Sequence, residues 1–106
     1  MQQANNTLTY EQAHNLFIYD DSTGVVYNRV HRNRVRAGDR AGYTGNHGYM
    51  SVQVDGIQYK LHRVIWLMVY GEWPYGEIDH INGERADNRI ANLRIVDRSG
   101  NQRNAA

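Results

Sequence analysis

Apolar residues near the N-terminus recur at helical spacing. A capping box formed by Thr9 and Gln12 overlaps the start of a stripe of four apolar residues: Tyr10, Ala13, Leu16 and Phe17. This pattern predicts a short helix over about residues 10–16. A cluster of turn-forming residues at 20–24 follows, and the apolar segment 25–27 after it predicts a strand.

Residues 49–61 alternate between apolar and polar side chains around Asp55-Gly56, a pair that favours a type I′ turn. The pattern predicts a β-hairpin. We expect one face of it to be apolar and buried, because pairing across the turn places Val54 opposite Ile57, Val52 opposite Tyr59 and Met50 opposite Leu61. The other face carries five more polar residues: Tyr49, Ser51, Gln53, Gln58 and Lys60.

Residues 63–70 are apolar on nearly every side, and Gly71 is suited to end them as a helix. We expect this central helix to cover the apolar face of the hairpin. Trp66 and Tyr70 are interpreted as core residues of that packing. His62, just ahead of the apolar run, is interpreted as a buried and hydrogen-bonded histidine rather than a ligand.

The last third of the chain predicts two short strands and a closing helix. Asn82-Gly83 marks a turn just after Asp79-His80, and residues 93–96 form the second strand-like segment. Asp97 can cap a final helix that contains Asn101. Taken together, the elements predict a small α+β domain.

Length and composition narrow the possible functions. At 106 residues the chain has the size of one ordinary domain, which excludes an enzyme with a separate cofactor domain. The absence of Cys excludes disulfides, thiolate zinc sites and thiol nucleophiles, and it leaves His, Asp, Glu and Asn as candidate metal ligands. No apolar run approaches the roughly 20 residues that a membrane span needs, so we expect a soluble cytoplasmic protein with no membrane partner.

The positive charge is concentrated in one stretch. Eleven of the twelve cationic residues are Arg, and residues 29–40 hold five of them against a single acid, Asp39: Arg29, Arg32, Arg34, Arg36 and Arg40. Arg grips phosphate oxygens in pairs, so this stretch favours binding to a polyanionic backbone. A solvated loop without a ligand is the alternative interpretation.

A connected set of residues in the last third resembles the HNH endonucleases, the ββα-metal nucleases of phages and intron-homing enzymes. The residues that carry the resemblance are His62-Arg63, Gly71-Glu72-Trp73-Pro74, Asp79-His80-Ile81-Asn82-Gly83, Asp87-Asn88-Arg89-Ile90, Asn92-Leu93-Arg94 and Asn101. The similarity is firm over residues 62–104, and residues 42–61 are similar to the hairpin region that precedes the motif in the phage branch.

The resemblance implies roles for individual residues. His80 takes the place of the general base, a role suited to an imidazole whose ordinary pKa is about 6.5. Asp79 and Asn101 take the places of the metal ligands, and their oxygen atoms favour one Mg²⁺ or Mn²⁺ ion over Zn²⁺. Neighbouring residues of a strand face opposite sides, so we expect a bend that lets both Asp79 and His80 serve one site. Asn92 takes a structural place in the motif.

The resemblance therefore implies a single HNH endonuclease domain over residues 1–106. Residues 1–61 would form a DNA-contacting helix and hairpin region, and residues 62–106 the central helix and the ββα-metal motif. The implied function is metal-dependent hydrolysis of double-stranded DNA, with nicking by a monomer or a double cut by a homodimer, and without a nucleotide cofactor. The five arginines of residues 29–40 together with Lys60 and Arg94 are candidate DNA contacts. A DNA-binding module on the same scaffold that cleaves weakly or not at all is the alternative.

Overall fold

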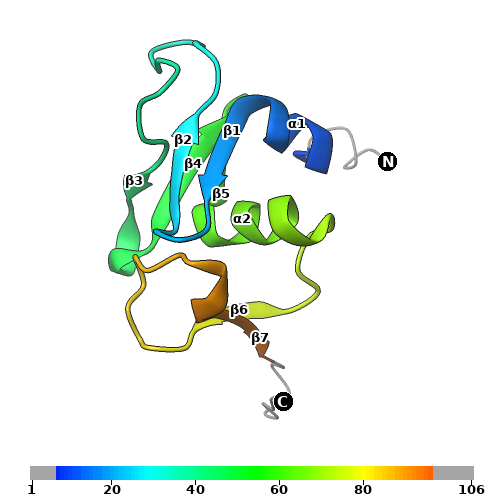
Figure 1. The fold of residues 1–106 in the computed structure, drawn as a ribbon, viewed down its shortest axis with the longest axis vertical. Coiled ribbons are helices and arrows are strands. Elements are labelled where there is room, and N and C mark those ends of the chain that lie inside the picture. The colour runs from blue at the N-terminus through cyan, green and yellow to red at the C-terminus, as the bar shows by residue number, and fades with distance from the viewer. Residues whose placement is uncertain (1–6, 97–106) are drawn as a thin grey trace.

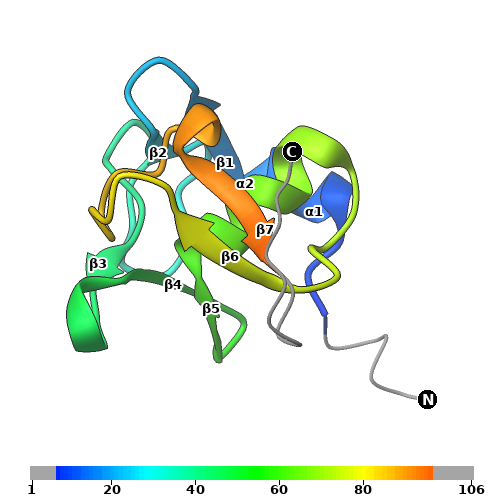
Figure 2. The ribbon, with the colours of Figure 1, turned by 90° about the horizontal axis from the view of Figure 1, so that it is seen from below.

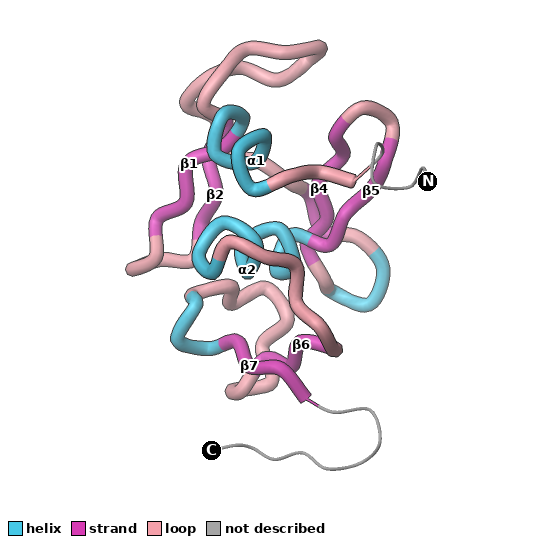
Figure 3. Tube along the Cα trace, turned by 90° about the vertical axis from the view of Figure 1, so that its right-hand side faces the viewer, coloured by secondary structure: helices cyan, strands magenta, loops and turns pink. Residues whose placement is uncertain are grey.

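The computed structural model describes residues 7–96, in which three small antiparallel sheets and two α-helices form one α+β domain. Helix α2 lies at the centre, with α1 and the first sheet above it and the last sheet below it (Figures 1 and 3). No helix in residues 7–96 is long and apolar enough to cross a membrane. The closing helix that the sequence predicts around Asn101 lies outside the described residues.

Helix α1 spans Tyr10–Leu16 and confirms the prediction from the capping box. The backbone amide of Gln12 donates to Thr9 Oγ1 over 3.1 Å, and the amide of Thr9 donates to Gln12 Oε1 over 3.0 Å. Strand β1, Phe17–Asp20, follows directly and pairs with β2, Val25–Asn28, around the predicted turn. Strand β1 was not expected, because Phe17 completed the apolar stripe of the helix.

The second sheet contains β3 (Tyr43–Thr44), β4 (Met50–Val54) and β5 (Ile57–Lys60). The predicted type I′ turn is confirmed, with φ of 52° at Asp55 and 82° at Gly56. The pairs Val54–Ile57 and Val52–Tyr59 are also confirmed. The pair of Met50 with Leu61 is wrong, because Leu61 already belongs to α2 and Met50 pairs with Thr44 of β3 instead.

Only part of the hairpin's apolar face is buried. Val52 and Val54 of β4 are almost fully buried, whereas Ile57 of β5 is 36% exposed. Helix α2, Leu61–Tyr70, packs against this hairpin as expected, and Gly71 ends it with φ of 84°. Tyr70 is 55% exposed, so its assignment to the core was wrong: it lies in the last turn of α2, with its ring centroid 4.5 Å from that of Trp66.

The third sheet is a two-stranded hairpin of β6, Glu77–His80, and β7, Leu93–Val96, which are the two strands expected from the sequence. Figure 2 shows both strands beside α2. The main core joins all layers through buried apolar side chains, among them Phe17, Val26, Val64, Ile65 and Leu93. Because this core includes both the N-terminal sheet and β7, the C-terminal hairpin is anchored to the rest of the domain.

Candidate active site

The two residues predicted to carry the chemistry lie side by side in β6. The ladder pairs Asp79 with Arg94 and His80 with Leu93. The side chain of Asp79 is 42% exposed, whereas His80 is only 5% exposed, as expected for neighbours that face opposite sides of a strand. Strand β6 ends at His80, so the chain bends after this pair of residues rather than between them.

His80 is buried against a short loop that returns from β6 to β7. Its Nε2 atom lies 2.8 Å from Oδ1 of Asn88, which is 2% exposed. An amide oxygen only accepts hydrogen bonds, so Nε2 carries the proton of the neutral ring. The lone pair is then on Nδ1, the nitrogen available to accept a proton.

A second histidine, His62 of α2, packs edge-on against His80 with ring centroids 5.0 Å apart. His62 is buried, as predicted, but its Nδ1 has no hydrogen-bond partner. Burial, followed by electrostatic repulsion from His80, Arg63 and Lys60, lowers the pKa of His62 to about 4. His62 is therefore a neutral ring at neutral pH and adds no charge beside His80.

Tyr49 and Arg85 join this site, although no pattern in the sequence indicated that they would lie there. The Tyr49 ring lies 5.9 Å from the His80 ring and 5.5 Å from the His62 ring. Two cationic groups lie over Tyr49, the guanidinium of Arg85 at 4.8 Å and the ammonium of Lys60 at 5.3 Å. The site thus carries positive charge at its border.

The loop at residues 81–92 is held by Asn92. Its buried amide donates to Asn82 Oδ1 over 3.0 Å and to the Asp87 carbonyl over 2.9 Å, and its Oδ1 accepts from the Asn82 backbone over 3.0 Å. Hydrogen bonds from Arg89 and then Asn82 hold the pKa of the Asp87 carboxyl well below its ordinary value. The loop that presents Asn88 to His80 is therefore tied at both ends.

Asp79 is the one predicted metal ligand within the described residues 7–96, because Asn101 lies outside them. Its Oδ2 accepts from Arg94 Nε at 3.0 Å and forms an ion pair with Arg94 Nη2 at 2.8 Å. Among the described residues there is no group of three His, Cys, Asp or Glu side chains placed to hold a metal. A half-exposed carboxylate still fits a hard, partly hydrated cation such as Mg²⁺, which uses few protein ligands.

The structure does not bring the arginine-rich stretch to His80. It belongs to the long loop between β2 and β3, most of which extends away from β6 and β7 (Figure 1), whereas Arg40 lines a pocket together with Ala86 and Asn88 of the loop that follows β6. Arg34, Arg36 and Arg40 are exposed there. Arg32 instead packs over the Phe17 ring at 5.4 Å, and Arg29 donates to the His14 carbonyl over 2.8 Å. The two arginines with these contacts have less freedom to reach a ligand than the three exposed ones.

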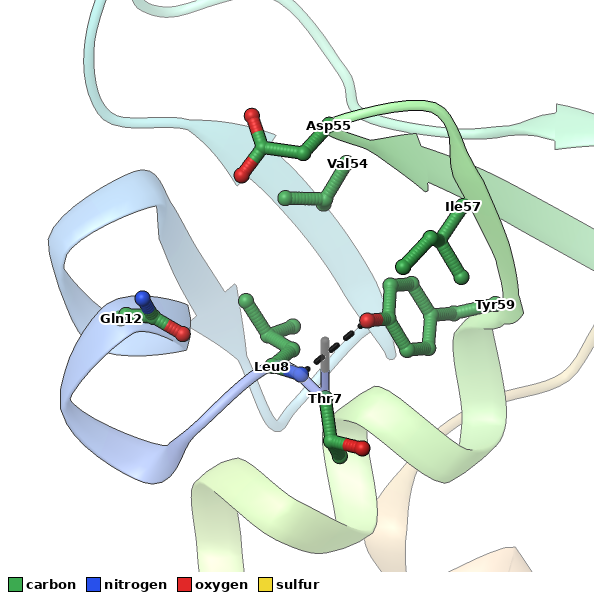
Figure 4. A pocket seen from close by; sticks show the side chains of 7 residues that line it. All are labelled: Thr7, Leu8, Gln12, Val54, Asp55, Ile57 and Tyr59. Atoms are coloured by element: carbon green, nitrogen blue, oxygen red, sulfur yellow. Dashed lines mark hydrogen bonds between the residues drawn. The ribbon is translucent and has the colours of Figure 1, made fainter. Parts of the chain in front are cut away.

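A pocket near the N-terminal segment contains none of the predicted site residues. It lies between α1 and the hairpin of β4 and β5, and seven residues line it: Thr7, Leu8, Gln12, Val54, Asp55, Ile57 and Tyr59 (Figure 4). The backbone amide of Leu8 donates to the Tyr59 hydroxyl over 3.0 Å across it. This contact closes the N-terminal segment onto the hairpin, and the pocket is separate from His80.

Comparisons with known proteins find similarity to HNH endonucleases in sequence and in fold. Residues 59–103 match a sequence model of HNH endonucleases. The fold is similar to that of the HNH homing endonuclease I-HmuI, whose structure concerns DNA binding and cleavage, with a TM-score of 0.55 and 21% sequence identity. The similar region covers 79% of this chain and 48% of I-HmuI, so the chain spans about half the length of that protein. No curated protein sequence matches the chain.

Proposed function

We propose that this chain hydrolyses phosphodiester bonds of DNA with His80 as general base, because residues 59–103 match a sequence model of HNH endonucleases and the fold is similar to that of the HNH homing endonuclease I-HmuI. The observation that carries the proposal is the buried hydrogen bond between His80 Nε2 and Asn88 Oδ1, at 2.8 Å. It gives a neutral imidazole a single orientation and leaves Nδ1 as the proton acceptor. This is the arrangement that a general base requires.

The proposed reaction is a hydrolysis in which His80 accepts one proton and solvent supplies another. His80 Nδ1 takes a proton from a water molecule while the water oxygen attacks the phosphorus. The bond from phosphorus to the 3′ oxygen breaks, and this oxygen takes a proton from solvent. The products are a 5′ phosphate and a 3′ hydroxyl, and one such site cuts one strand at each encounter.

Asp79 and Asn101 are the residues that would hold a divalent ion, and Mg²⁺ or Mn²⁺ suits their oxygen atoms. When bound, such an ion would supply Lewis-acid stabilisation of the charge that develops on the phosphate. Arg94 pairs with Asp79 at 2.8 Å, so this guanidinium must share the carboxylate with the ion or move away. Both side chains are about half exposed, which leaves room for either change.

Double-stranded DNA is the proposed substrate, and two separate basic regions would contact it. Lys60 and Arg85 border His80, close to the phosphate that is cut. Arg34 and Arg36 are exposed in the loop between β2 and β3 and would contact the backbone away from the cut, whereas Arg40 lines a pocket with Ala86 and Asn88 and would contact it nearer to the cut. The contacts would then divide into one group that acts on the reacting phosphate and one that only adds affinity.

Conversion of supercoiled plasmid to open circles by the purified chain tests the proposal. We expect open circles in Mg²⁺ or Mn²⁺, followed later by linear DNA, and no conversion in EDTA. Equal conversion with and without EDTA would contradict the metal-dependent mechanism. A folded chain that binds the plasmid and leaves it supercoiled in both ions, also on libraries of random target sequence, would instead support a DNA-binding module without cleavage.

A further inference from the structure

We propose that Asn88 is a positioning residue for His80 and that the N-terminal hairpin of β1 and β2 holds Asn88 in place. The inference rests on the proposed function, because the position of His80 affects turnover only if His80 is the base. It assigns a role to a part of the chain, residues 17–28, that lies outside the segment matched by the HNH model.

The buried side chain of Asn88 accepts one hydrogen bond, from His80, in a fixed direction. Its side chain and that of His80 are 2% and 5% exposed, and Nε2 and Oδ1 are 2.8 Å apart. A buried imidazole nitrogen without such a partner would lose a hydrogen bond that water no longer replaces. The amide oxygen therefore selects the tautomer with the proton on Nε2, and it also fixes the rotation of the ring.

The backbone of Asn88 is held by a residue far away in the sequence. The hydroxyl of Tyr19, in β1, donates to the Asn88 carbonyl over 2.6 Å, a contact between residues 69 positions apart. Burial raises the pKa of Tyr19 to about 12, so the hydroxyl keeps its proton and remains a donor at neutral pH. This bond reaches the loop from outside the C-terminal hairpin.

The turn between β1 and β2 packs closely against the backbone of Asn88 and Arg89. Gly24 is buried and has φ of 79°, and a Cβ atom on it would lie 2.5 Å from the Arg89 nitrogen and 2.7 Å from the Asn88 carbonyl carbon. Only glycine fits there, because a side chain would meet backbone that cannot move aside. The turn itself is braced by Asp20, whose carboxylate accepts from the amide and hydroxyl of Ser22 at 3.0 and 2.7 Å.

These contacts form a chain from the N-terminal hairpin to the base. Strand β1 and the following turn fix the backbone of Asn88, and Asn88 fixes the ring of His80. A ring in the other tautomer would carry its lone pair on Nε2, the nitrogen that faces the loop, and could not accept a proton from water at Nδ1. The wrong tautomer therefore lowers the rate of cleavage without removing any group that touches DNA.

Ring ¹⁵N shifts of the full chain test this directly, with the His80 signals identified by their loss in His80→Gln. We expect the neutral His80 ring to carry its proton on Nε2 in the wild type and a mixture of tautomers in Asn88→Ala. Asn88→Asp keeps an oxygen acceptor and should keep the wild-type tautomer. The single-turnover rate of cleavage should fall by at least about tenfold in Asn88→Ala, while its Kd for DNA stays at the wild-type value.

Tyr19→Phe provides a second variant that removes one hydroxyl and keeps the ring. It should shift the tautomer and the rate in the same direction as Asn88→Ala but less, whereas Tyr43→Phe, on an exposed ring of β3, should change neither. A wild-type ring with its proton on Nδ1, or an unchanged tautomer in Asn88→Ala and Tyr19→Phe, would overturn the inference. If the tautomer depends on Asn88 but the wild type cleaves no DNA, the proposed function fails and the positioning role of Asn88 stands.

Discussion

The guanidinium of Arg94 lies 2.8 Å from the carboxylate of Asp79, directly across the ladder of β6 and β7. Cross-strand partners of opposite charge stabilise a sheet only slightly when water reaches them. Here the arginine also occupies the oxygen that the proposed divalent ion needs. The pair therefore sets up a competition between a protein cation and a metal cation for one carboxylate.

Replacing Arg94 with Gln should make the carboxylate easier for the ion to reach. The Mg²⁺ concentration at half-maximal cleavage should fall, because the competing charge has gone, and the free energy of unfolding should change by less than about 1 kcal/mol. A Mg²⁺ titration of the cleavage rate and a urea titration measure the two effects. Arg89→Gln is the matched control, because Arg89 pairs with Asp87 in the same way but away from Asp79. A higher Mg²⁺ midpoint in Arg94→Gln would contradict the competition.

His62 should make the domain less stable at acidic pH. Its folded-state pKa of about 4 lies below the ordinary 6.5, so the unfolded chain binds the proton more readily. The stability is complete above about pH 6.5 and is lost as the pH falls towards 4, by on the order of 2 kcal/mol. Urea titrations at pH 7 and pH 4.5 should show a smaller difference in His62→Phe than in the wild type. His31→Asn, in the exposed loop, should retain the wild-type difference, and equal differences in all three proteins would refute the assignment.

Asn92 should matter for stability through the loop it ties. Asn92→Ala removes the three hydrogen bonds that the buried Asn92 amide makes with Asn82 and Asp87, so we expect a loss of about 1–3 kcal/mol in the free energy of unfolding. Asn15→Ala, on the exposed side of α1, should change the stability much less. Urea titrations compare the two variants, and similar losses in both would show that the loop is held by other interactions.

The two basic regions should have different effects on DNA cleavage. Arg34→Gln with Arg36→Gln should weaken binding and reduce the slope of log Kd against log salt by about 1 for each phosphate that is no longer neutralised, with the rate at saturating DNA unchanged. Lys60→Gln with Arg85→Gln removes the same number of charges beside His80 and should also lower the rate at saturating DNA. Binding at several salt concentrations and single-turnover rates provide the comparison. A slower rate in the first pair would show that the arginine-rich loop reaches the reacting phosphate.

Local signals in the sequence were enough for much of the fold. The capping box of Thr9, the Asp55-Gly56 turn and the glycine after α2 each act within a few residues, and the structure confirms all three. Strand β1 was missed because Phe17 continues the helical stripe, and only its pairing with Asn28 makes it extended. Tyr70 was misplaced because an apolar run does not indicate which of its residues face outward at a helix end.

The candidate site was predictable only in part, because some of its contacts join residues that lie far apart in the sequence. The resemblance to HNH endonucleases pointed to His80, Asp79 and Asn92, and the structure adds the hydrogen-bond partners and neighbouring side chains of these three residues. The contacts of Tyr49 and Arg85 with one another, and of Tyr19 with Asn88, join residues that are 36 and 69 positions apart and carry no motif. Such pairs depend on how the sheets pack around α2, which no local pattern encodes.

The measurement that tests the central claim most directly is the single-turnover rate of DNA cleavage in His80→Gln. A glutamine side chain remains neutral and polar in this buried place but cannot take up a proton, so the rate should fall by about 100-fold or more while DNA binding persists. His31→Ala, in the exposed loop between β2 and β3, should cleave at the wild-type rate. A folded His80→Gln that cleaves as fast as the wild type would contradict the assignment of His80 as the general base.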